Sequence, residues 1–179
     1  MIGKAGIGVV RASALVMVVF VAIAVWAVAL AGANDAVPSA AARCMTPRLV
    51  VWLDANSGGA AAGSVLYSLK FTNLSGHACT LVGYPGVSAV DLAGRQLGST
   101  AGRNPQAPSR VVTLRAGDTA NAVLQISQAA NFPTGACHRV TAAGLRVYPP
   151  NTFRAKIVPI PFPACSRSGP VYLHVERVQ

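Results

Sequence analysis

The ten residues Ser64–Asn73 have the sequence SVLYSLKFTN, and they decide the fold class of the chain. Val65, Tyr67, Leu69 and Phe71 fall on one face of this stretch, and Ser68, Lys70 and Thr72 fall on the other. A period of two is typical of a β-strand that buries one face, whereas a helix would repeat every 3.6 residues. The stretch therefore predicts a half-buried strand.

The same period recurs further along the chain. Alternation is present at 119–127, 145–148, 153–157 and 171–176, and shorter apolar runs occur at 49–53, 80–82, 87–92 and 110–114. Turn-forming sequences separate these runs, among them Ser57-Gly58-Gly59, Ala116-Gly117-Asp118 and Ser168-Gly169-Pro170. Many short strands with frequent turns predict an all-β, antiparallel sandwich. No long helix is predicted after residue 42, and residues 98–109 are expected to form an exposed loop.

The N-terminal segment predicts export. Residues 12–33 contain no charged side chain, and Lys4 and Arg11 precede them. As a helix this segment would extend about 33 Å, enough to cross a hydrocarbon core of about 30 Å. Its length favours an uncleaved anchor with the N-terminus inside, whereas Ala31-Gly32-Ala33 favours a cleaved signal peptide. Both readings divide the chain into a leader (1–33), a linker (34–42) and an extracytoplasmic domain (43–179).

The charge balance is basic. The chain has 15 Lys and Arg against 5 Asp and Glu. On the predicted strands, Arg146, Arg154 and Lys156 share the outward face of neighbouring segments. Such a face would bind an anionic envelope polymer or lipid head groups, or dock another envelope protein, and a merely solvated surface is the alternative. Nucleic acid is not expected as a partner, because the domain is exported and its basic stretches lack interleaved aromatics.

Four cysteines, Cys44, Cys79, Cys137 and Cys165, suggest two disulfides in an exported domain. Three connectivities are open. We favour Cys44–Cys79 with Cys137–Cys165, which closes two loops of about 30–35 residues. No metal site is expected, because the sequence lacks CxxC and HxxxH pairs.

The sequence offers no recognisable catalytic site. Asp54, Asp91 and Asp118 each adjoin a predicted turn, and the GxSxG and phosphate-binding glycine motifs are absent from the sequence. We therefore expect no enzyme activity and no cofactor. A secreted enzyme with an unrecognised active site is the alternative.

Residues 71–87 have the sequence FTNLSGHACTLVGYPGV. The segment resembles the signature of the actinobacterial secreted domain of unknown function 4232, whose core begins with F-x-N and ends with C-x-L-x-G-Y-P. The similarity extends over residues 43–178 and includes the opening Cys44, the late Cys137 and the sequence LRVYPP at 145–150.

The resemblance implies an immunoglobulin-like β-sandwich attached to an export signal or a membrane helix, with no catalytic residues to transfer. The core of the signature, Gly83-Tyr84-Pro85-Gly86, is expected to be a stiff turn in which the Tyr84 ring caps the sandwich core. We therefore expect a non-catalytic binding or structural module of the cell envelope.

Overall fold

The strand predicted at Ser64–Asn73 lies inside a five-stranded sheet. A computed structural model describes residues 41–105 and 108–179. In it β2 (Ser64–Asn73) pairs antiparallel with β1 (Leu49–Ala61) on one side and with β8 (Thr119–Ser127) on the other. β11 (Leu173–Val175) and β6 (Gly102–Arg103) complete the order β1-β2-β8-β11-β6. The predicted bounds of β2 and β8 are confirmed.

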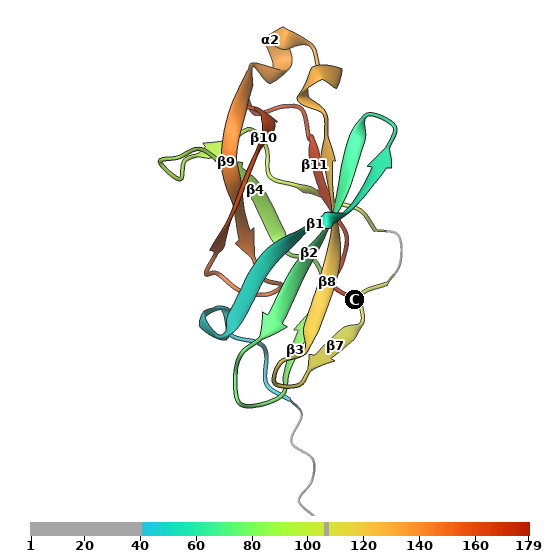
Figure 1. Cartoon of the computed structure of the whole chain (residues 1–179), viewed down its shortest axis with the longest axis vertical. Helices are drawn as coiled ribbons and strands as arrows, with labels where there is room; N and C mark the ends of the chain where they lie inside the picture. The colour runs from blue at the N-terminus through green and yellow to red at the C-terminus, as the bar shows by residue number, and fades with distance from the viewer. Residues whose placement is uncertain (1–40, 106–107) are drawn as a thin grey trace, which may run out of the picture. The chain divides into compact units, whose positions relative to one another are not determined.

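A four-stranded sheet forms the second layer (Figure 1). Its order is β10 (Lys156–Cys165), β9 (Arg139–Tyr148), β4 (Gly86–Val90) and β5 (Gln96–Leu97). β3 (Cys79–Val82) and β7 (Val111–Leu114) form a separate ribbon. The short helices are η1 (Thr46–Arg48), η2 (Ala129–Asn131) and α2 (Thr134–Cys137).

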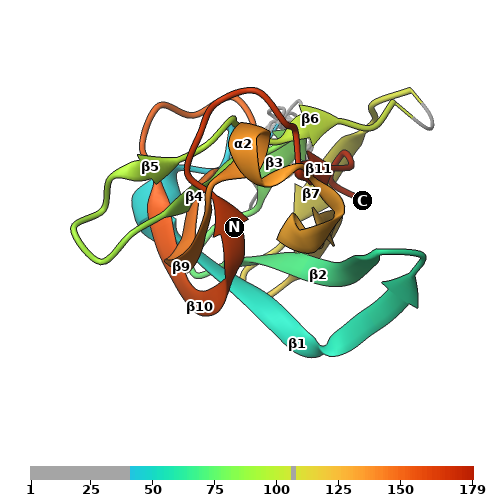
Figure 2. The same ribbon diagram turned by 90° about the horizontal axis from the view of Figure 1, so that it is seen from above.

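The core lies between the two larger sheets, which face each other in Figure 2. The predicted apolar face of β2 supplies Leu69 and Phe71, and β8 supplies Leu124, all fully buried. Leu145 and Val147 of β9 are buried on the opposite side. The predicted all-β class and sandwich are confirmed, and the pairing is antiparallel except where β11 meets β6.

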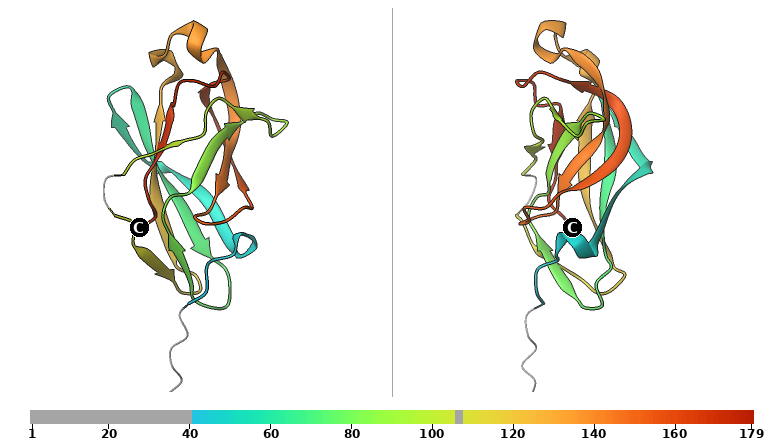
Figure 3. Two further views of the ribbon diagram at one scale, coloured as in Figure 1. Left: turned by 180° about the vertical axis from the view of Figure 1, so that it is seen from behind. Right: turned by 90° about the vertical axis from the view of Figure 1, so that its left-hand side faces the viewer.

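The chain crosses between the layers after β5, because β5 belongs to the four-stranded sheet and β6 to the five-stranded one (Figure 3). The segment predicted as an exposed loop at 98–109 therefore contains a short strand. The hydroxyl of Tyr172 donates to the Leu97 carbonyl at 3.1 Å beside this crossing.

The predicted orientation of Tyr172 is wrong. Alternation over 171–176 predicted that Tyr172 would face outward, but its side chain is fully buried, and burial raises its pKa to about 12. The strand begins only at Leu173, so the alternation does not extend to Tyr172.

The predicted turn at Ser57-Gly58-Gly59 is wrong, because β1 continues past it to Ala61. The pairing of β1 with β2 shifts between Asp54 and Gly59, and β1 bends there (Figure 2). The Ser57 hydroxyl accepts a hydrogen bond from the Ser68 amide at 2.9 Å and so bridges the irregularity. The actual turn follows β1 and contains Gly63, whose φ is +68°.

Three exposed prolines, Pro159, Pro161 and Pro163, alternate along β10. This strand lies at the end of its sheet, where the order is β10-β9-β4-β5. Proline is tolerated at such an edge because the outer side of an edge strand needs no N–H donor.

The predicted leader at 1–33 and nearly all of the linker at 34–42 lie outside the described residues. Among the residues that the structure does describe, no helix has the length and apolar character needed to cross a membrane.

The disulfides have the connectivity favoured from the sequence. Cys44 is bonded to Cys79 and Cys137 to Cys165. The first joins the start of the domain to β3, and the second joins α2 to the end of β10. Two disulfides indicate an oxidising, extracytoplasmic environment.

Asn73, the last residue of β2, is fully buried and joins three segments. Its Nδ2 lies 2.9 Å from the carbonyl oxygen of His77, 3.0 Å from that of Leu114 and 3.1 Å from that of Arg115. Its Oδ1 accepts from the amide of Ser75 at 2.9 Å and from the Ser75 hydroxyl at 2.7 Å. One side chain therefore ties β2 to the β2–β3 loop and to the end of β7.

Replacing Asn73 with Asp is expected to lower the free energy of unfolding by about 2–4 kcal/mol. The substitution removes the donor and turns a carboxylate oxygen toward buried carbonyl oxygens. Urea unfolding of the full chain in detergent measures the loss. The control is Asn121→Asp on β8, where the backbone rather than the side chain bonds to Gln179. Equal stability of the two variants would contradict the role given to Asn73.

Replacing both cysteines of either disulfide with alanine is expected to destabilise the domain by about 3–4 kcal/mol, because each bridge restricts the unfolded chain. The bridges span sequence separations of 35 and 28 residues, so their effects should be similar. Guanidinium unfolding of each double variant tests this. An unchanged midpoint would show that the bridge is dispensable.

Candidate functional site

The predicted basic face does not form. In the pairing of β9 with β10, Arg146 lies opposite Ile157, and Lys156 lies opposite the fully buried Val147. Directly opposed residues project to the same face of a sheet. Arg146 and Lys156 therefore project to opposite faces. Arg154 precedes the strand, because β10 begins at Lys156 and the strand predicted at 153–157 is displaced toward the C-terminus.

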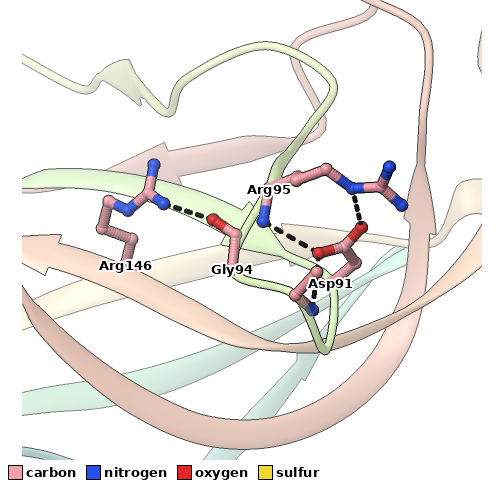
Figure 4. A network of polar contacts seen from close by, with 5 residues as sticks. Asp91, Gly94, Arg95 and Arg146 are labelled. Atoms are coloured by element: carbon pink, nitrogen blue, oxygen red, sulfur yellow. Dashed lines mark hydrogen bonds and ion pairs between the residues drawn. The ribbon is translucent and has the colours of Figure 1, made fainter.

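Arg146 is engaged within the fold. Its guanidinium donates to the carbonyl oxygen of Gly94, in the loop between β4 and β5 (Figure 4). In the same loop the carboxylate of Asp91 accepts from the Arg95 amide and from the Arg95 Nε, both at 2.8 Å. These hydrogen bonds hold the pKa of Asp91 below its usual value, the Arg95 amide acting most strongly. The Asp91–Arg95 turn and Arg146 thus form a structural network.

A surface cleft lies instead where the segment 83–86 of the family signature meets the segment that follows LRVYP at 145–149. Gly86 of β4 pairs with Tyr148 of β9, so the Gly83–Gly86 turn and the segment after Tyr148 are neighbours. Between them is a cleft of about 550 Å³, which we call the tyrosine cleft. It is lined by Gly83, Tyr84, Gly86, Arg103, Ser109, Tyr148, Pro149, Asn151, Thr152 and Phe153.

Both walls of the tyrosine cleft are fixed by the fold. Pro85 and Pro149 are buried, and Gly83 adopts a φ of +95°, which favours glycine. The Gly83 carbonyl accepts from the Val178 amide at 2.9 Å. On the other wall, Asn151 Nδ2 donates to the Val82 carbonyl at 3.0 Å. Residues 83–85 thus form a short connection from β3 to β4, which belong to different sheets.

Tyr84 is half-buried and lies in the wall of the cleft rather than among the buried core residues. The guanidinium carbon of Arg103 lies 5.6 Å from the centre of the Tyr84 ring, a cation–π contact. Arg103 belongs to β6, which is held by parallel pairing with β11. A guanidinium has five N–H donors, and a contact with an aromatic ring leaves donors for an anion.

A second cleft, of about 520 Å³, shares the segment Asn151–Phe153 with the first. We call it the methionine cleft, and its lining is Arg43, Cys44, Met45, Thr46, Pro47, Asn151, Thr152, Phe153 and Arg154. The Thr46 hydroxyl donates to the Arg154 carbonyl at 3.2 Å across it. Neither lining contains an acidic residue, so both clefts are basic.

The remaining chemistry-bearing side chains are scattered. In the part of the chain that the structure describes, no three side chains of His, Cys, Asp and Glu come together as a metal site would require. His138 Nδ1 lies 2.7 Å from the Ser166 Oγ, beside the Cys137–Cys165 bridge. The Ser166 hydroxyl also lies 3.0 Å from the His138 carbonyl, so the pair bonds within itself.

Sequence reasoning found the Gly83–Gly86 turn but missed Arg103, Tyr148 and Phe153 as its neighbours. Arg103 reaches Tyr84 through the crossing after β5, which has no local signal. The sequence LRVYPP at 145–150 could have drawn attention to Tyr148, because Tyr148-Pro149 is a second Tyr-Pro pair like Tyr84-Pro85.

Comparison with the curated proteins and with the solved structures finds no match. A family model does match, over residues 44–179, and its description is domain of unknown function (DUF4232). The match includes both disulfides, the Asn73 network, the tyrosine cleft and all of the methionine cleft except Arg43. Since it covers most of the chain, the protein belongs to the DUF4232 family.

Proposed function

We propose that the domain is a non-catalytic binding module of the cell envelope, and that the tyrosine cleft holds an anionic envelope polymer. The observation that carries this proposal is the Arg103 guanidinium over the Tyr84 ring, in a cleft without acidic residues. The fitting ligand is a glycan chain that bears carboxylate or phosphate groups.

The lining can contact both the sugar rings and the anionic groups of such a ligand. Aromatic side chains with a few polar groups are typical of ligand sites, and Tyr84, Tyr148 and Phe153 supply the aromatic surface here. Arg103 supplies the charge, since a guanidinium binds carboxylate or phosphate with two parallel hydrogen bonds. Asn151 and Thr152 add polar side chains at the rim that the two clefts share.

The location fits this function. The disulfides indicate an extracytoplasmic environment, and we propose that residues 1–33 direct export as a signal peptide or an anchor. An exported domain meets the polymers of the envelope directly. The excess of basic residues would attract such polymers over distances of about 10 Å at moderate salt.

Full-length protein in detergent is expected to bind polygalacturonate and poly(glycerol phosphate) but not neutral dextran of similar length. Arg103→Gln should weaken binding about 10-fold, because it removes a charge-assisted hydrogen-bond donor. Tyr84→Ala should weaken it as well, since Arg103 loses the ring that orients it. Isothermal titration at low and high salt measures both effects.

The matched control is Arg115→Gln, which makes the same charge change on the β7–β8 turn outside the lining. It should bind nearly as the parent does. An equal loss in Arg103→Gln and Arg115→Gln would show a diffuse charge effect and overturn the cleft as the site.

The rival function, a secreted hydrolase, rests on the contact between His138 and Ser166. We expect Ser166 to be unreactive toward a fluorophosphonate probe, because the imidazole nitrogen that an orienting carboxylate would engage is bonded to Ser166 itself. Labelling is read by mass spectrometry of the intact chain. Labelling that is lost in Ser166→Ala would favour the enzyme.

A further inference from the structure

We propose that the methionine cleft is a docking surface for an anionic lipid bilayer, with Phe153 and Met45 entering the interface and Arg43 and Arg154 binding lipid phosphates. This site adjoins the proposed polymer site and shares Asn151–Phe153 with it, but its arginines are Arg43 and Arg154 rather than Arg103. The proposal also gives a function to Met45 and Phe153, two exposed apolar side chains that line this cleft.

Phe153 and Met45 are unusually exposed for apolar side chains. Phe153 is 99% exposed and Met45 is 66% exposed, and both line the same cleft. A phenyl ring in full contact with water is unfavourable, and burying it against an apolar surface would be favourable. Clustered exposed apolar side chains often mark a surface that another partner covers.

The fold holds the backbone that carries these two side chains. Met45 follows Cys44, which is fixed by the bridge to Cys79. The Met45 carbonyl accepts from the Arg48 amide at 2.9 Å, which closes the turn of η1. On the other side, the Thr152 hydroxyl donates to the Pro149 carbonyl at 2.9 Å. The apolar tips are therefore presented by ordered turns, and binding would require little additional ordering.

The charge of the cleft selects an anionic partner. Arg43 and Arg154 are both exposed and lie on the same lining as Phe153 and Met45, without an acidic residue. Each basic side chain near an anionic membrane surface strengthens binding through its attraction to the lipid phosphates. Aromatic rings flanked by basic residues are characteristic of the head-group region.

The position in the chain favours a bilayer over a soluble partner. Only the nine linker residues 34–42 separate Arg43 from the predicted membrane segment 12–33. Nine residues extend at most about 30 Å, so an anchored domain would stay within reach of the head groups. At such a high effective concentration, a weak surface contact becomes persistent.

The full-length protein, reconstituted at one copy per nanodisc, tests this docking by hydrogen–deuterium exchange. In discs that contain phosphatidylglycerol, peptides covering 42–48 and 149–155 should exchange at least about 3-fold more slowly than in discs of phosphatidylcholine alone. Arg43→Gln with Arg154→Gln should abolish the difference, and Phe153→Ser should reduce it. Arg95→Gln with Arg115→Gln, an equal charge change elsewhere, should leave it intact.

Equal exchange in the two kinds of disc would overturn the proposal, as would protection that survives the Arg43 and Arg154 changes. Failure here is distinguishable from failure of polymer binding, because each site depends on different arginines. Arg103→Gln should leave the lipid-dependent protection unchanged, and the Arg43 and Arg154 pair should leave polygalacturonate binding nearly unchanged. Protection that requires added polygalacturonate would assign the methionine cleft to the polymer and reject the bilayer.

Discussion

The side-chain amide of Asn73 is the interaction on which the arrangement of the lower part of the sandwich depends. Its Nδ2 lies within hydrogen-bond distance of three carbonyl oxygens, and its Oδ1 accepts from the amide and the hydroxyl of Ser75, while Asn73 itself is fully buried. Through these bonds the end of β2 fixes the start of β3 and the end of β7. β3 then leads into the turn at Gly83, so the tyrosine cleft depends on an asparagine outside it.

The residues of the family signature have different physical roles. Phe71 fills the core, Asn73 joins loops, and Cys79 ties β3 to the domain's N-terminal end. Tyr84 differs from these residues, because it is half-buried and meets the exposed Arg103 at the surface. Because Tyr84 lies in the wall of a surface cleft rather than in the core, its ring is open to contact from outside the domain.

Much of the fold was predictable because burial on one face of a strand imposes a period of two. That pattern gave the bounds of β2 and β8 and the buried face of β9. It failed where a strand begins or bends. Because β10 begins only at Lys156, Arg154 lies outside the sheet. The alternation in β10 is also shifted by one residue from the predicted one, so Arg146 and Lys156 project to opposite faces. The clefts were not predictable, because Arg103 reaches Tyr84 only through the crossing after β5, and Met45 reaches Phe153 only through contacts between segments far apart in the sequence.

The alternating prolines of β10 affect whether two copies of this domain can pair through the edges of their sheets. The free edge of a sheet exposes backbone groups that invite another strand, and each proline removes one N–H from that strand. An edge depleted of donors is a poor template for strand exchange or fibril growth. A strand from another copy of the domain would therefore find few hydrogen-bond donors along the outer edge of β10.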